Sequence, residues 1–218
     1  MKLVLFDCDG TLVDSASTIH ETMRRTFLHF NKPEPALSAT KSIMGLTLDI
    51  AIARMDNKPH VDDEALAMMA YYKSLFTEVR QASDYREPPL FDGIRNVVER
   101  LAAQEAILIG AVTGKSRRGL DAILDVHGFR PHFIVSRTAD DCPSKPHPAM
   151  VTECCDETGM RPEQTIVIGD AIYDMQMAKS AGAKAIGVSW GSASVEQLLA
   201  TGADIVVHQP HDLLDHIL

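Results

Sequence analysis

Residues 7–15 read DCDGTLVDS, and they directly follow the short apolar run KLVLF at residues 2–6. An apolar run of this length bounded by polar residues is typical of a buried strand. Asp7 and Asp9 then stand one residue apart just past the carboxyl end of that strand, which is where open α/β sheets bind ligands. Gly10 allows the backbone to turn sharply and approach such a ligand closely. For the tripeptide at residues 7–9 alone, a solvated turn at a strand end is the favoured explanation, so the role of the two carboxylates depends on the rest of the chain.

The composition indicates a globular protein with room for a sizeable core. The chain has 218 residues, of which 45% are hydrophobic and 23% are charged, as is ordinary for soluble globular proteins. The net charge of −9 disfavours a nucleic-acid backbone or an anionic membrane as partner. Small phosphates remain compatible with that charge, because a metal and a lysine can make a local site positive. We therefore expect no nucleic-acid partner and no membrane partner.

Neither a signal peptide nor a membrane helix is expected. The chain begins with a strand followed by polar residues, and no apolar run reaches the roughly 18 residues that a membrane helix needs. The four cysteines include no Cys-x-x-Cys pair. The default expectation for such cysteines is that they are reduced thiols in a reducing compartment. These features predict a cytoplasmic protein, and they leave its oligomeric state open.

Helical and strand patterns divide the chain into two parts. Apolar residues at helical spacing predict helices at 19–30, after the loop at 45–49, and from 61 to about 79. From residue 90 onward strands and helices alternate, and such alternation predicts a mostly parallel sheet covered by helices on both faces. We therefore predict an α/β fold, with a doubly wound (Rossmann-like) parallel sheet core at residues 1–15 and 86–218 and an inserted all-helical cap at residues 16–85.

Polar side chains stand at several predicted strand ends. After the two aspartates of the first strand these are Thr113 with Gly114, then Lys145 just before a helix, and then Asp170 with Asp174. The carboxyl ends of the strands in a doubly wound sheet converge on one crevice, where hard oxygen ligands suit Mg²⁺ together with a substrate phosphate. Singly, each residue has a plainer explanation as a helix cap, a surface lysine or a charge at a helix N-terminus. Their joint occurrence in this order favours a functional site.

These stretches resemble the motifs of the haloacid dehalogenase (HAD) superfamily, specifically its phosphoglycolate-phosphatase-like branch. Residues 7–15 are similar to the first motif without a mismatch, 113–115 to the second, 145–148 to the third and 169–174 to the fourth. The cap inserted behind the first motif resembles the α-helical C1 type. The resemblance covers nearly the whole chain and implies an Mg²⁺-dependent phosphatase that hydrolyses a small phosphate monoester, phosphoglycolate-like or a sugar phosphate, through an aspartyl-phosphate.

The resemblance also implies roles for the carboxylates. Asp7 would attack phosphorus, and Asp9 would protonate the leaving oxygen and later take a proton from the attacking water. Mg²⁺ would bind the Asp7 carboxylate, the main-chain oxygen of Asp9, Asp170 and the phosphate. Asp174 would position either the waters of the metal or Lys145.

The remaining implied site residues bind the substrate. Thr113 and the Gly114 N–H would hold phosphoryl oxygens beside the turn at Gly10, and Lys145 would offset their charge. In the cap, the loop that contains Gly45 and Thr47 is expected to face the crevice and contact the substrate. A helix-connecting turn with Thr47 as an N-cap is an equal alternative.

Two other functions fit the same residues. A sugar phosphomutase of the β-phosphoglucomutase type would use the same core, and a catalytically silent binding module would keep only the fold. The presence of every catalytic residue type argues against the silent module. The carboxylate of Asp9 argues against a dehalogenase, because dehalogenases of this superfamily lack it.

Overall fold

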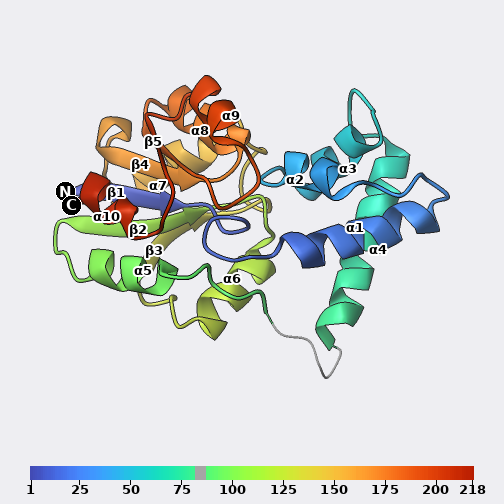
Figure 1. Cartoon of the computed structure of the whole chain (residues 1–218), viewed down its shortest axis with the longest axis horizontal. Helices are drawn as coiled ribbons and strands as arrows, with labels where there is room; N and C mark the ends of the chain where they lie inside the picture. Colours follow the sequence, from blue (N-terminus) through green and yellow to red (C-terminus); the bar gives the residue numbers. More distant parts are fainter. Residues whose placement is uncertain (82–86) are drawn as a thin grey trace.

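The centre of the molecule is a parallel sheet of six strands in the order β3-β2-β1-β4-β5-β6 (Figure 1). The structure is a computed structural model that describes residues 1–81 and 87–218. The strands are β1 (Lys2–Phe6), β2 (Ile107–Val112), β3 (Phe133–Arg137), β4 (Thr165–Gly169), β5 (Lys184–Val188) and β6 (Ile205–Val207). The order changes direction at β1, which pairs with both β2 and β4. A ligand site is expected beside the carboxyl end of β1, where the strand order reverses.

The continuous apolar run in β1 reflects burial of the sheet on both faces. Val4 and Phe6 belong to the hydrophobic core on one face, whereas Leu3 and Leu5 belong to the core on the other. Side chains alternate between the two faces of a strand, so a strand buried on both sides contains no polar alternation. All four of these side chains are fully buried.

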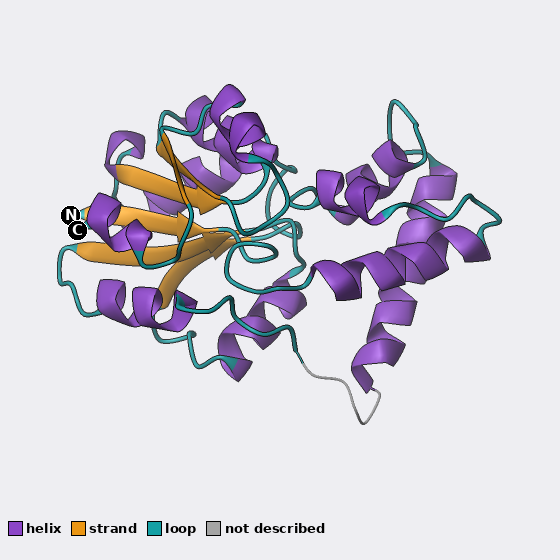
Figure 2. Ribbon diagram, in the orientation of Figure 1, coloured by secondary structure: helices purple, strands orange, loops and turns teal. Residues whose placement is uncertain are grey.

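Helices cover both faces of the sheet (Figure 2). The helices that follow residue 90 are α5 (Ile94–Ala102), α6 (Arg117–Val126), α7 (Ala149–Thr158), α8 (Ile172–Ala181), α9 (Val195–Ala200) and α10 (Asp212–Ile217). Apolar residues of α5, α6 and α10 contribute to one core, and those of α7, α8 and α9 to the other. The predicted doubly wound α/β core is therefore confirmed.

Four helices lie to one side of the sheet, at its carboxyl edge (Figure 1). They are α1 (Ala16–His29), α2 (Leu37–Ile43), α3 (Leu48–Met55) and α4 (Asp63–Gln81). They bury a hydrophobic cluster that includes Met23, Ile52 and Met68, and Ala171 and Tyr173 at the start of α8 also belong to it. Helix α2 is the one element here that the sequence analysis does not predict. It is only seven residues long and no side chain caps its N-terminus, so it presents neither of the usual signals.

The two connections between these helices and the sheet run side by side. Asp14 N donates to Pro89 O at 2.9 Å, and Phe91 N donates to Leu12 O at 3.1 Å. Helix α1 begins at Ala16, the first residue of the predicted cap. The predicted boundary between residues 85 and 86 lies outside the described residues. Within the described ranges, no helix combines the length and the apolar character needed to cross a membrane.

Candidate active site

Lys145 connects two carboxylates at the carboxyl edge of the sheet. Its Nζ lies 2.9 Å from Asp7 Oδ1 and 2.5 Å from Asp174 Oδ1. Asp7 follows β1, Asp174 lies in the first turn of α8, and Lys145 lies in the loop between β3 and α7. All three side chains are buried. Of the two roles predicted for Asp174, the structure therefore favours contact with Lys145.

Asp170 follows β4 and is held by two donors. Its Oδ1 accepts from Thr11 Oγ1 at 2.8 Å, and its Oδ2 accepts from Ser192 N at 2.8 Å. Gly10 lies against the same carboxylate with a φ of +88°, and a Cβ at Gly10 would lie 2.3 Å from Asp170 Oδ2. Only glycine satisfies both the left-handed backbone and this close approach. The predicted turn at Gly10 thus packs directly on Asp170.

Oxygen atoms of Asp7, Asp170 and Asp174 all lie within 4.8 Å of one another. Burial raises the pKa of Asp7 to about 7; the positive charge of Lys145 opposes this rise and the negative charge of Asp174 adds to it. Burial, followed by the charge of Asp7, raises the pKa of Asp170 to about 6. Burial also raises the pKa of Asp174, against the charge of Lys145. The cluster therefore holds more buried negative charge than one lysine can balance.

Asp9 points to a different set of partners from Asp7. Its Oδ1 accepts from Ser15 Oγ at 2.6 Å and lies 2.9 Å from Lys115 Nζ. The Asp9 side chain does not belong to the carboxylate cluster, which is compatible with the prediction that only its main-chain oxygen meets a metal. The attraction of Asp9 keeps the pKa of Lys115 above its ordinary value despite burial, so this lysine is a cation.

The end of β2 brings Thr113 and Gly114 to the same crevice. Thr113 is fully buried, and its Oγ1 accepts from Lys115 N at 3.2 Å. At Gly114 a Cβ would lie 2.4 Å from Leu46 O and 2.7 Å from Gly45 O. The absence of a side chain at Gly114 thus allows the loop between α2 and α3 to approach the sheet edge.

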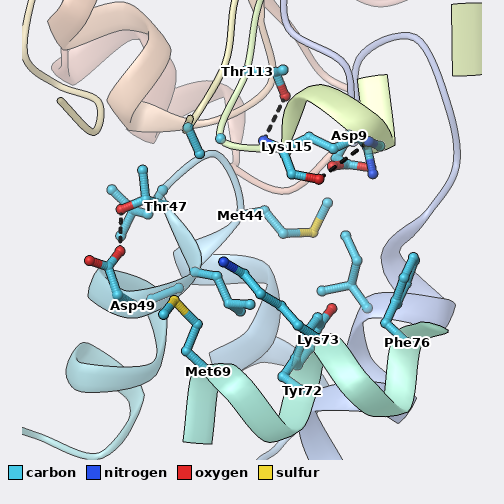
Figure 3. Close-up of a pocket in the computed structure, with 18 of the residues that line it drawn as sticks. Asp9, Met44, Thr47, Asp49, Met69, Tyr72, Lys73, Phe76, Thr113 and Lys115 are labelled. Carbon is cyan, nitrogen blue, oxygen red and sulfur yellow. Dashed lines mark hydrogen bonds and ion pairs between the residues drawn. The ribbon is translucent and has the colours of Figure 1, made fainter. Parts of the chain in front are cut away.

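A cavity of about 540 Å³ lies between the sheet edge and the four helices (Figure 3). Asp7, Asp9, Thr113 and Gly114 line one end of it, and the loop that contains Gly45 and Thr47 lines another part. The structure therefore brings this loop to the crevice, as predicted. Thr47 also stands at the N-cap position of α3, although its hydroxyl donates to Asp49 Oδ1 at 2.6 Å and its N–H to Ser144 Oγ at 2.9 Å.

The sequence analysis names most of the clustered residues but misses several of their partners. It assigns no role to Lys115, although it quotes this residue within a motif, and it does not mention Ser192 or Lys73. Ser192 reaches Asp170 from the loop after β5, and Lys73 lines the cavity from α4. For Ser192, its position after a strand is at most a sequence signal of a place near the site. For Lys73, a position on the polar face of a helix gives no signal that the side chain enters a cavity.

The comparisons with known proteins agree with this fold. The family description "Haloacid dehalogenase-like hydrolase" matches residues 4–188. A "Probable phosphatase IndB" of Dickeya dadantii is 30% identical over 94% of this chain and 88% of its own length. A phosphoglycolate phosphatase of Pseudomonas putida is 28% identical over 98% of this chain and 78% of its own length. The crystal structure of a hydrolase from Pseudomonas syringae superimposes with a TM-score of 0.85 at 23% identity, covering 100% of this chain and 98% of that one.

A doubly wound sheet with aspartates and a buried lysine at its carboxyl edge places the chain in the α/β class. The chain belongs to the haloacid dehalogenase-like hydrolase family. These relatives confirm the prediction of a phosphoglycolate-phosphatase-like member of that family. They also confirm the predicted enzyme class, phosphoric monoester hydrolase.

Proposed function

We propose that this protein is an Mg²⁺-dependent phosphatase that hydrolyses a small-molecule phosphate monoester, phosphoglycolate-like or a sugar phosphate, through an aspartyl-phosphate on Asp7. The observation that carries this proposal is the buried cluster in which Asp7 adjoins both Lys145 and Asp170 at one end of a cavity. Such a cluster combines a nucleophile, a cation for the phosphoryl group and further oxygen ligands in one place.

Asp7 is the proposed nucleophile. Its Oδ1 lies beside Lys145 as an ion pair, and neither of its oxygens accepts a hydrogen bond of good geometry from the described residues. One carboxylate oxygen would form a bond to phosphorus while the bond from phosphorus to the leaving oxygen breaks. Water would then attack the same phosphorus, which releases inorganic phosphate and restores the Asp7 carboxylate.

Asp9 is the proposed acid and base. It lies two residues after the nucleophile and lines the cavity, so it stands on the side from which a substrate would enter. It would give its proton to the leaving oxygen in the first step and take a proton from the attacking water in the second. Ser15 and Lys115 hold its carboxylate on this side.

The cluster fits a divalent cation. Three buried carboxylates share one lysine, and neither oxygen of Asp7 accepts a hydrogen bond of good geometry from the described residues. The Asp7 and Asp170 carboxylates and the Asp9 main-chain oxygen would hold Mg²⁺, and Asp174 would act through Lys145. When bound, Mg²⁺ supplies positive charge that offsets the charge of the phosphate.

Thr113, Gly114 and Lys145 are the proposed phosphate ligands. Thr113 supplies a hydroxyl and Gly114 a main-chain N–H from the end of β2, and Lys145 supplies a fixed positive charge. Donors that are already in place stabilise the negative charge of the transition state without reorganising. A buried lysine that is locked between two carboxylates meets this requirement.

The domain division is part of the proposal. Residues 1–15 and 86–218 would form the catalytic core, and residues 16–85 a cap that opens to admit the substrate and closes to exclude water. The hydrophobic cluster formed mainly by the four helices supports this division, although Ala171 and Tyr173 of the core also join it. The adjacent chain connections at residues 12–14 and 89–91 support it too. Thr47 and Gly45 would then reach the substrate from the cap.

The direct test is phosphate release from a panel of phosphate monoesters by the purified protein, with Mg²⁺ and with excess chelator. We expect release with Mg²⁺ and none in chelator. Conversion of a hexose 1-phosphate to its 6-phosphate without net release would instead identify a mutase. No turnover of any ester would identify a silent binding module.

The four free cysteines are all buried, and we propose the cytoplasm as the location.

A further inference from the structure

The cavity beside Asp9 is larger than a two-carbon leaving group requires. Its volume of about 540 Å³ falls within the range of roughly 300–1,000 Å³ that pockets for drug-sized ligands occupy. It extends from the aspartates at the sheet edge to α4. A substrate as small as phosphoglycolate would leave most of this space to water.

The helical side of the cavity is mostly apolar. The side chains that face it from this side include Ile19, Met23, Met44, Leu46, Met69 and Phe76. Methionine side chains adapt their shape to an apolar group, because they are unbranched and flexible. A wall of this kind favours a substrate that carries apolar surface rather than a row of hydroxyl groups.

One cation interrupts the apolar wall. Lys73 extends from α4 into the cavity (Figure 3), which Met44 and Met69 also line. Among the residues that the structure describes, no carboxylate forms an ion pair with Lys73. Lys115, at the other end of the cavity, is by contrast paired with Asp9. Lys73 is therefore available to a ligand.

Asp49, Asp140 and Arg118 also line the cavity, and each makes a hydrogen bond with an uncharged group. Asp49 accepts from the Thr47 hydroxyl at 2.6 Å, Asp140 accepts from Arg117 N at 2.7 Å, and Arg118 donates to Thr77 Oγ1 at 3.2 Å. Lys73 is thus a cation without an ion-pair partner among the described residues, and it lies among apolar side chains away from the phosphate site. A matching ligand would carry a second anionic group, separated from its phosphate by an apolar segment.

We propose that the cavity selects phosphate monoesters whose alcohol carries an apolar segment that ends in a second anionic group, a carboxylate or a second phosphate, which Lys73 binds. This proposal rests on the proposed phosphatase function and narrows its substrate class. The apolar segment lies along the methionine-rich wall, and Lys73 determines specificity without touching the reacting phosphorus.

The test uses a homologous series in which phosphoglycolate is the first member. Unbranched ω-phosphooxy carboxylates of increasing chain length are compared with alkyl phosphates of the same lengths, with Mg²⁺ present. We expect kcat/KM to rise along the carboxylate series, by about fourfold for each added methylene group until the wall is covered, since that is the factor for burying one CH₂. At the optimal length the carboxylate exceeds the alkyl phosphate.

Variants of Lys73 separate charge from shape. Lys73→Met lowers kcat/KM for the best carboxylate by roughly 10- to 100-fold, which is the effect of losing a charged hydrogen bond, and leaves the alkyl phosphates nearly unchanged. Lys73→Arg retains most of the preference, and the exposed Lys184→Met, remote from the cavity, has no effect. A thermal melt of each variant confirms that it is folded.

Two results overturn this proposal while leaving the phosphatase function standing. One is a maximum of kcat/KM at phosphoglycolate itself. The other is an equal effect of Lys73→Met on the carboxylates and on the alkyl phosphates. Failure of the wild-type protein to release phosphate from any ester would instead overturn the proposed function, so the two failures are distinguishable.

Discussion

Lys115 Nζ lies 2.9 Å from Asp9 Oδ1, and this ion pair holds the proposed acid and base on the cavity side of the sheet edge. Lys115 is a positioning residue in this account, since its main-chain N–H donates to Thr113 and its ammonium group is occupied by Asp9. The pair also connects the second motif of the chain to the first.

Lys115→Met is expected to lower kcat for alkyl phosphates by about tenfold or more, within the range that a lost general acid or base gives. The loss should be smaller for nitrophenyl phosphate, whose leaving group departs without a proton. Steady-state rates on the two esters measure this ratio. An equal loss on both would show that Lys115 supports the fold or the phosphate and not the acid.

Lys145→Met removes the one cation among three buried carboxylates. We expect the free energy of unfolding of the metal-free protein to fall by about 3–5 kcal/mol near neutral pH, because uncompensated buried charge is costly. Protonation relieves that charge, so the loss should shrink as the pH is lowered towards 5. Urea unfolding at two pH values tests this, and a loss independent of pH would contradict it.

Asp170→Asn tests the raised pKa of Asp170, which is about 6 against an ordinary value of 3.8 and results mainly from burial. The folded metal-free protein thus binds this proton more tightly than the unfolded chain does. The resulting stabilisation is complete below about pH 4 and is lost as the pH rises through 6. We expect wild type to lose roughly 1–3 kcal/mol relative to the variant over that interval.

The same experiment with Mg²⁺ provides the control. Mg²⁺ should raise the unfolding temperature of wild type more near pH 7 than near pH 4, because protons and the cation compete for the carboxylates. The shift should be much smaller in Asp170→Asn. An undiminished shift in the variant would remove Asp170 from the metal site.

Gly114→Ala tests the contact between the cap loop and the sheet edge. A Cβ at this position would lie 2.4 Å from Leu46 O, so the loop would have to move away while the Gly114 N–H stays available. We expect kcat/KM to fall at least about tenfold, since misplacement by one ångström is known to be costly. Ser144→Ala, which removes only the bond from Thr47 N, should have a milder effect. Unchanged kcat/KM in Gly114→Ala would separate the loop from catalysis.

The meeting of side chains at the strand ends was predictable, because the topology of the sheet brings those ends together. Asp7, Thr113, Lys145 and Asp170 each follow or precede a recognisable element, and a doubly wound sheet places those positions at one edge. The motifs therefore predicted which side chains would meet. They did not predict that burial would leave Asp7 without a hydrogen bond of good geometry, because that depends on the packing around it.

Contacts made by the helical segment were not predictable in the same way. Helix α2 has a weak local pattern, and the entry of Lys73 into the cavity depends on how α4 packs against α1 and α3. A lysine on an amphipathic helix has the same sequence signature whether it faces water or a cavity. The proposed substrate preference therefore depends on the packed structure and not on a sequence pattern.

The central claim is that Asp7 carries the phosphoryl group, and trapping that intermediate tests it most directly. Wild-type protein with Mg²⁺ and a substrate labelled in its phosphate is quenched in acid, and the protein-bound label is measured on one portion. In a second portion the acyl phosphate is reduced with borohydride, which releases the phosphate, before peptide mass spectrometry. We predict that residue 7, and no other aspartate, is converted to homoserine. Asp7→Asn should show no label and should turn over about 10⁴- to 10⁶-fold more slowly. Label on another residue, or normal turnover by Asp7→Asn, would contradict the account.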